Sequence, residues 1–141
     1  MPEVLDPKVP APVEVKGGVV AYLNVDGAIA AATFYEKAFG AQIAATYEPD
    51  GQGRTMHVHL YINGSSVMLS DFYPEQGLAK VEPQAFSLML MVDRDIEARF
   101  RRAAEAGCEV VMPVQKMFWG DIYGQLRDPF GVSWAMNQPD A

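Results

Sequence analysis

Cysteine is almost absent from this chain of 141 residues, in which Cys108 is the only one. A single cysteine excludes an intramolecular disulfide and a cluster of thiolates that would hold zinc. Cys108 directly follows Gly107, where a helix is expected to end and a strand to begin. We therefore expect a buried thiol without a chemical role.

Basic residues are few as well: 11 Lys and Arg stand against 18 Asp and Glu, which gives a formal net charge of −7. Nucleic-acid phosphates require clustered positive charge, so nucleic acid is not an expected partner. The chain has no apolar run as long as a membrane span and does not open with a basic and then apolar leader. These absences predict a cytoplasmic protein with no membrane partner.

What the chain does contain is an internal repeat, in which residue n matches residue n+67 from residue 20 to the end without a gap. Leu23-Asn24-Val25-Asp26 returns as Leu90-Met91-Val92-Asp93, and Gly40 returns as Gly107. A fixed offset indicates two copies of one supersecondary unit. Two copies are too few for a stacked array, so the repeat predicts one pseudo-symmetric domain.

The hydrophobic pattern of each copy predicts the element order βαβββ. In the first copy the helix should begin at Asp26 as its N-cap and end at Gly40. In the second copy the helix should begin at Asp93. The predicted fold class is α+β: two tandem βαβββ units, residues 19–72 and 86–138, form a pseudo-symmetric, curved mixed sheet around a cavity. Both units belong to a single domain, residues 19–138.

The segment before the first unit, residues 1–18, holds four prolines and ends in Gly17-Gly18. Such a segment cannot form a regular helix or a central strand. We expect an extended arm that is either disordered or laid on a neighbouring subunit.

Several motifs support a resemblance. The segment 34–41, Phe-Tyr-Glu-Lys-Ala-Phe-Gly-Ala, resembles the first-helix signature of the vicinal oxygen chelate superfamily. Residues 119–124 and 127–131 are similar to its glyoxalase and bleomycin-resistance branch. The resemblance implies a homodimer that surrounds a small-molecule cavity. It leaves the activity open, because this fold hosts glyoxalases, dioxygenases and antibiotic-binding proteins.

The resemblance also bears on metal binding. Members that do chemistry hold a divalent metal with four His, Glu or Gln side chains from the first and last strands of the two units. The corresponding positions here are Val20, Met68, Ser87 and Ala135. None of these side chains offers the carboxylate or imidazole that such ions prefer. The resemblance therefore implies no inherited metal site, and no cofactor is expected.

Two histidines remain as candidates for chemistry. His57 and His59 lie two residues apart on an expected strand, so both rings project from the same face. Asp71 could complete a three-ligand metal site, although the alternation of strand side chains places it on the face opposite to that of Met68. Three interpretations stay open: a metal at His57, His59 and Asp71, a pair of ligand hydrogen-bonding groups, and a solvated pair.

Because successive side chains of a strand point to opposite faces of a sheet, the sequence also predicts which side chains face a ligand. Flat aromatic rings in the second unit suit stacking on a planar or cationic molecule. The alternation places Trp134 on the core face of its strand, so we expect it to pack in the core. The predicted ligand-binding residues are Tyr22, Asn24, His57, His59, Tyr61, Ser70, Phe118, Trp119 and Tyr123.

Two functions compete on these observations. The first is a metal-free small-molecule-binding protein of the glyoxalase and bleomycin-resistance type, which sequesters an antibiotic or planar aromatic compound. The alternative is a lyase, isomerase or dioxygenase-like enzyme that uses His57 or His59, with or without a relocated metal. A purely structural module is disfavoured by the inward polar residues. No catalytic residue is assigned.

Overall fold

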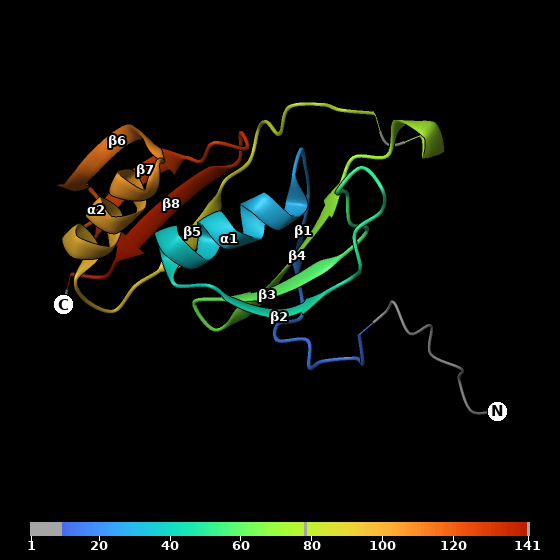
Figure 1. The fold of residues 1–141 in the computed structure, drawn as a ribbon. Helices are drawn as coiled ribbons and strands as arrows, with labels where there is room; N and C mark the ends of the chain where they lie inside the picture. Colours follow the sequence, from blue (N-terminus) through green and yellow to red (C-terminus); the bar gives the residue numbers. More distant parts are fainter. Residues whose placement is uncertain (1–9, 78, 141) are drawn as a thin grey trace. The chain divides into compact units, whose positions relative to one another are not determined.

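The computed structural model of the protein describes residues 10–77 and 79–140. These residues form two compact units, each built on a four-stranded sheet (Figure 1). Unit 1 ends at residue 80 and unit 2 follows, except that residues 37–40 belong to unit 2. The predicted α+β class with two βαβββ units is confirmed.

Unit 1 has the sheet order β1-β4-β3-β2, with β1 parallel to β4 and the other pairs antiparallel. The β3–β4 hairpin turns at Asn63 and Gly64, whose φ angles of 51° and 83° are those of a tight hairpin turn. The elements are β1 (Ala21–Val25), α1 (Ala28–Phe39), β2 (Gln42–Thr46), β3 (Val58–Ile62) and β4 (Ser65–Asp71).

Unit 2 repeats this topology, with the sheet order β5-β8-β7-β6 and β5 parallel to β8. Along the chain, a short 3-10 helix, η1 (Pro74–Gln76), follows β4 and precedes β5, and the sequence pattern did not predict it. The elements of unit 2 are β5 (Leu88–Met91), α2 (Ile96–Ala106), β6 (Glu109–Lys116), β7 (Ile122–Arg127) and β8 (Ser133–Gln138).

Each sheet of the structure has one buried apolar face. In unit 1 the alternate residues of β1, β3 and β4 that form this face are Leu23, Val25, Val58, Leu60, Ile62, Val67 and Leu69, none more than 7% exposed. In unit 2, α2 packs against β6, β7 and β8 through Ile96, Phe100 and Ala103. Trp134 is 1% exposed, and its indole N–H donates to Asp128 Oδ2 at 2.8 Å. The prediction that Trp134 packs in the core is confirmed.

The start of α1 departs from the prediction. Asp26 is exposed and forms an ion pair with Lys80, so it does not cap the helix. The cap comes instead from Asp71 at the end of β4, whose Oδ1 accepts from the backbone N–H groups of Gly27 (2.8 Å) and Ala28 (3.2 Å). Because β4 pairs with β1, its last residue lies beside the point where the chain leaves β1 for the helix. The cap is therefore distant in sequence.

The start of α2 follows the same rule. The helix begins at Ile96 and not at Asp93, and Gln138 Oε1 accepts from the Ile96 N–H at 3.0 Å. Gln138 ends β8 and lies 67 residues after Asp71. Both units thus cap their helix from the last residue of their last strand.

The repeat is not free of gaps, and the sheet register shows where it slips. In unit 1 Leu60 pairs with Val67, and in unit 2 Leu126 pairs with Trp134. Trp134 follows Val67 by 67 residues, but Leu126 follows Leu60 by only 66. The second hairpin is one residue longer, because Asp128 organises its turn by accepting from the N–H groups of Phe130 and Val132.

The slip changes which residues correspond. The counterparts of His57 and His59 on β7 are Tyr123 and Gln125, one position before those that a constant offset would give. The expectation of one unbroken offset is wrong for this strand.

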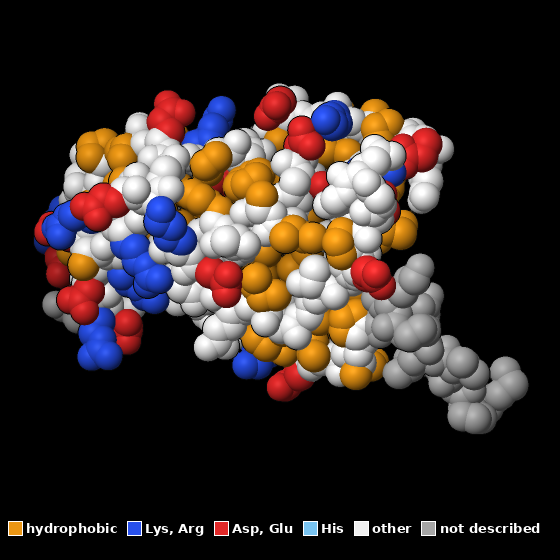
Figure 2. All heavy atoms as spheres, in the orientation of Figure 1, with side chains coloured by type: hydrophobic (Ala, Val, Ile, Leu, Met, Phe, Trp, Pro, Cys, Tyr) orange, Lys and Arg blue, Asp and Glu red, His pale blue; other side chains and the backbone are white. Residues whose placement is uncertain are grey.

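The cysteine and the basic residues of α2 behave as expected. Cys108 is buried, and desolvation, followed by the nearby Asp128, raises the pKa of its thiol to about 12. Arg99, Arg101 and Arg102 are exposed on α2. On the face shown in Figure 2, basic side chains lie next to acidic ones. A mixed, solvated surface of this kind is typical of an exposed helix.

The described part of the N-terminal arm, residues 10–18, lies against its own unit. Lys16 N donates to Ser66 Oγ at 2.8 Å, and Ser66 N donates to Lys16 O at 2.9 Å. Tyr61 Oη donates to Glu14 O at 2.6 Å. Neither a free arm nor one attached only to a neighbouring subunit describes these contacts. Residues 1–9 of the predicted arm fall outside the described residues.

No helix in the described part of the chain is long and apolar enough to cross a membrane.

Candidate functional site

The candidate site lies on the face of the unit 1 sheet that is opposite to the apolar core. Cross-strand pairing places its residues in rows. Tyr22, Met68 and His59 form one row, because Tyr22 and His59 both pair with Met68. Asn24 pairs with Ser70 in the next row. The alternation predicted from the sequence therefore holds for this sheet.

His59 is the buried end of a hydrogen-bonded chain. Its side chain is 3% exposed, and Nε2 lies 2.7 Å from Ser66 Oγ. Ser66 Oγ in turn accepts the backbone N–H of Lys16. Burial lowers the pKa of His59 below its ordinary value, so the ring is held neutral at pH 7. The chain connects the ring to the arm.

His57 lies between aromatic side chains. Its Nδ1 is 3.1 Å from Tyr22 Oη, and its ring centroid is 5.1 Å from that of Tyr47. Tyr22 Oη also donates to the carbonyl of Met56 at 3.2 Å. Burial, and to a smaller extent the neighbouring His59, lowers the pKa of His57. Both histidines are therefore neutral hydrogen-bonding groups at physiological pH.

A pocket of about 280 Å³ opens beside the two histidines. The sheet supplies one wall and the arm supplies the other, so the arm closes a space that the sheet alone would leave open. Of the lining residues in the described part of the chain, none is Asp, Glu, Lys or Arg. They are Pro10, Ala11, Pro12, Val13, Val15, Ala45, Tyr47, His57, His59 and Met68.

Three further residues predicted for the site have other contacts. Tyr61 holds the arm through Glu14, and the Lys16 ammonium lies 4.3 Å from the centroid of its ring. The Ser70 hydroxyl is buried and donates to the Asp71 carbonyl at 2.8 Å. Asn24 is half-buried in the row of Ser70. None of the three lines the pocket.

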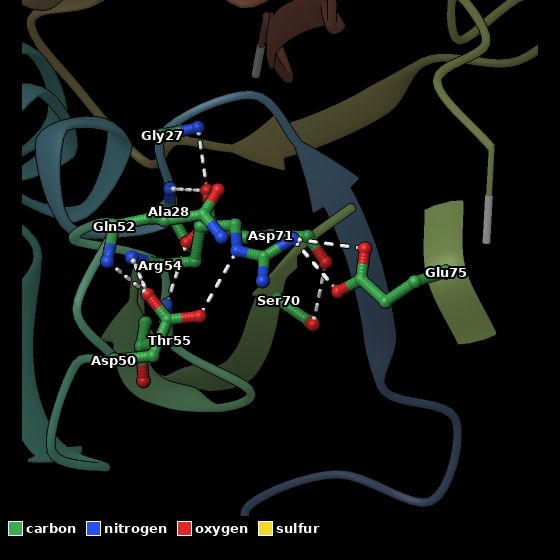
Figure 3. A network of polar contacts seen from close by, with 9 residues as sticks. All are labelled: Gly27, Ala28, Asp50, Gln52, Arg54, Thr55, Ser70, Asp71 and Glu75. Carbon is green, nitrogen blue, oxygen red and sulfur yellow. Dashed lines mark hydrogen bonds and ion pairs between the residues drawn. The ribbon is translucent and has the colours of Figure 1, made fainter. Parts of the chain in front are cut away.

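Asp71 does not join the histidines. Its carboxylate is 4% exposed, and it lies in the polar network of Figure 3. Oδ1 caps α1, and Oδ2 accepts the backbone N–H of Thr55 at 2.8 Å. The group connects the start of α1 to the loop before β3. Within residues 10–77 and 79–140, no three His, Cys, Asp or Glu side chains gather where they could hold a metal.

The positions that would hold the superfamily's metal do not fit one. In unit 1 Met68 lies between Tyr22 and His59, and a thioether is a poor donor for a hard or borderline divalent ion. In unit 2 Ala135 is fully buried and pairs with Met89 and Gln125. Because neither position supplies a charged or imidazole donor, we derive no chemistry through such a metal.

The remaining predicted residues lie in unit 2 and are not among the residues that line the pocket described above. Phe118 is 95% exposed and Trp119 is 47% exposed, at the turn between β6 and β7. Their rings meet edge to face with centroids 5.0 Å apart, and Trp119 meets Tyr123 in the same way at 5.6 Å. Phe118, Trp119 and the half-buried Tyr123 thus form a row of aromatic rings, here called the aromatic ladder. A single site that includes this ladder and the histidines remains a prediction.

Sequence reasoning missed the contribution of the arm. The pocket residues that it did not select are chiefly apolar arm residues, together with Tyr47 and Ala45 on the edge of the sheet. The run of prolines in the arm was the available signal, because a stiff, extended segment loses little entropy when it lies on a sheet. Tyr47 directly follows β2, which ends at Thr46.

The comparisons with known proteins identify the family. Residues 18–136 match the model of the Glyoxalase/Bleomycin resistance protein/Dioxygenase superfamily. The chain belongs to this superfamily. It is 36% identical over 132 residues to the uncharacterized protein Mb0911c of Mycobacterium bovis, with 90% of this chain and 86% of the relative covered.

Solved structures agree on the fold. Protein PA1353 from Pseudomonas aeruginosa superposes with a TM-score of 0.70 at 28% identity, over 86% of this chain and 98% of that one. A glyoxalase-related enzyme from Fulvimarina pelagi superposes with a TM-score of 0.69 at 20% identity, over 88% of each chain. The second similarity shows the fold alone.

Proposed function

We propose that this chain is a small-molecule-binding protein that holds its ligand in the unit 1 pocket, between the His57–His59 face and the N-terminal arm. In this proposal it sequesters an antibiotic or a planar aromatic compound without a metal. The observation that carries the proposal is the pocket of about 280 Å³, which combines apolar walls with two neutral imidazoles. Apolar lining with a few converging polar groups is typical of ligand sites.

A pocket-filling variant tests this function. Ala45 lines the pocket, so Ala45→Phe should occupy it and reduce the affinity for any ligand bound there at least tenfold. Calorimetric titration with quinones, fused-ring aromatics and peptide antibiotics would measure the effect. Met112→Phe, at the corresponding position of unit 2, is the matched control and should leave binding unchanged. Equal affinity in the wild type and in Ala45→Phe would place the ligand elsewhere and overturn the proposal.

The second candidate is an enzyme that uses the histidines. It is supported by the i, i+2 pair, whose neutral rings can accept a proton or bind a relocated metal. Its test is the metal content of protein purified without an affinity tag and then dialysed. One equivalent of zinc, nickel, manganese or iron that is lost in His57→Ala would favour the enzyme over the binding protein. Turnover of a bound ligand would do the same.

We also propose a homodimer. Its support is the set of exposed apolar side chains in unit 2, which a partner would cover: Met89, Met91, Val110, Val111 and Phe118. Light scattering over a dilution series should give twice the chain mass at micromolar concentration. A constant monomer mass would contradict the proposal.

A further inference from the structure

The hydrogen bonds of Tyr22 define which nitrogen of His57 carries its proton. Tyr22 Oη lies 3.2 Å from the Met56 carbonyl oxygen and 3.1 Å from His57 Nδ1. A carbonyl only accepts, so the single hydroxyl proton goes to Met56 when both contacts are hydrogen bonds. His57 Nδ1–H must then donate to Tyr22 Oη. A neutral imidazole has one N–H, which leaves Nε2 as an acceptor.

His59 does not offer the same group. Its Nε2 is already engaged with Ser66 Oγ, at 2.7 Å. For His57 Nε2 no partner is found among the described residues, and the ring lines the pocket. The pocket therefore presents one imidazole nitrogen, His57 Nε2, that can accept a hydrogen bond from a ligand.

Charge around the pocket argues against an ionic ligand. No acidic side chain lines it, so a cation would lose its water without gaining a counter-charge. The Lys16 ammonium lies over Tyr61, whose ring is 5.0 Å from that of His59, and it repels a cation further. Among the described residues no Lys or Arg lines the pocket to meet an anion, and the two histidines are neutral.

The volume sets the ligand's size. A space of about 280 Å³ is at the lower end of the range for small-molecule sites, which is about 300–1,000 Å³. It suits one or two fused rings, and a peptide antibiotic would require the arm to move away.

We infer that the unit 1 pocket takes an uncharged one- or two-ring aromatic molecule that donates an O–H or N–H to His57 Nε2. This inference rests on the proposed function and specifies its ligand class. Tyr22 acts as a positioning residue, because it selects the acceptor nitrogen without lining the pocket itself. Of the planar or cationic molecules that the aromatic rings suggested, this inference selects a planar, uncharged donor.

Naphthol and its methyl ether, methoxynaphthalene, test the inference, since they share a ring system and only naphthol can donate. Their dissociation constants would be measured with the full-length protein by NMR titration. The wild type should bind naphthol about five- to tenfold more tightly. His57→Ala should bring the two affinities within about twofold, while Gln125→Ala, at the matching position of His59 in unit 2, should keep the preference.

Tyr22→Phe gives an independent readout on an exposed residue that the fold can spare. Without the hydroxyl, both tautomers of His57 become accessible, so the preference for naphthol should fall and the imidazole nitrogen signals should show a mixture. Equal binding of both compounds to the wild type, unaffected by His57→Ala, would overturn the ligand class and leave the pocket function standing. No binding of either compound at millimolar concentration would overturn both.

Discussion

Asp71 in unit 1 and Gln138 in unit 2 have the same role: each ends the last strand of its sheet and accepts a backbone N–H from the start of its unit's helix. The sheet faces opposite the cores differ. Unit 1 presents His57 and His59, covered by the arm, where unit 2 presents Tyr123 and Gln125 beside exposed methionines. The two units therefore share the capping position that fixes the start of the helix, although its residue differs, while the side chains on their open sheet faces differ in chemical character.

The largest expected effect tests the shared capping. Asp71→Ala removes the acceptor of three backbone N–H groups, from Gly27, Ala28 and Thr55, and should lower the free energy of unfolding by about 3 kcal/mol. Gln138→Ala removes one neutral hydrogen bond and should cost only about 1 kcal/mol. Urea denaturation measures both. Equal losses would contradict the stronger role assigned to the cap in unit 1.

A second prediction tests the shifted register. Gly124 corresponds to Val58, but a Cβ at Gly124 would lie 2.7 Å from Phe100 Cε2. Gly124→Ala should therefore cost about 1–3 kcal/mol through overpacking. The double variant with Phe100→Leu should recover part of this loss. A neutral Gly124→Ala would show that α2 does not pack against β7 as described.

A third prediction concerns the pH dependence of stability, in which the two units differ because both histidines of the chain lie in unit 1. Their pKa values are lowered in the folded protein from the ordinary 6.5, so the unfolded chain takes up protons first. Their stabilising contribution is complete above pH 6.5 and is lost as the pH falls through the folded values. Denaturation midpoints measured from pH 7 downward should show this loss. The variant with both histidines changed to Gln should lack that part of the decline.

The smallest expected effect concerns the aromatic ladder of unit 2. Phe118 is almost fully exposed, so Phe118→Ser should change the free energy of unfolding by no more than about 0.5 kcal/mol. A larger loss in the monomeric protein would show that the ladder is part of the core. A loss that depends on protein concentration would instead place Phe118 in the proposed dimer contact.

The sequence predicted most of the fold because both the repeat and the alternation are local patterns. The alternation of side chains alone placed His57 and His59 on one face of the unit 1 sheet with Met68, and Trp134 on the buried face of the unit 2 sheet. Capping by Asp71 was not predictable, since it depends on the parallel pairing of β1 with β4, which joins residues 46 positions apart, such as Val25 and Asp71. The wall formed by the arm escaped prediction for a related reason, because in its hydrogen bonds to Ser66 and Tyr61 the arm contributes only backbone groups, which leave no side-chain pattern in the arm.

The central claim is that the ligand binds in unit 1, beneath the arm. It is tested most directly by mapping the backbone amide shifts of the whole protein during titration with naphthol. The account predicts shifts confined to residues 10–16 and to the segments of unit 1 around the pocket, residues 45–47, 57–59 and 68, with the β6–β7 turn unchanged. Shifts centred on Phe118, Trp119 and Tyr123, with His57 and His59 unaffected, would contradict it.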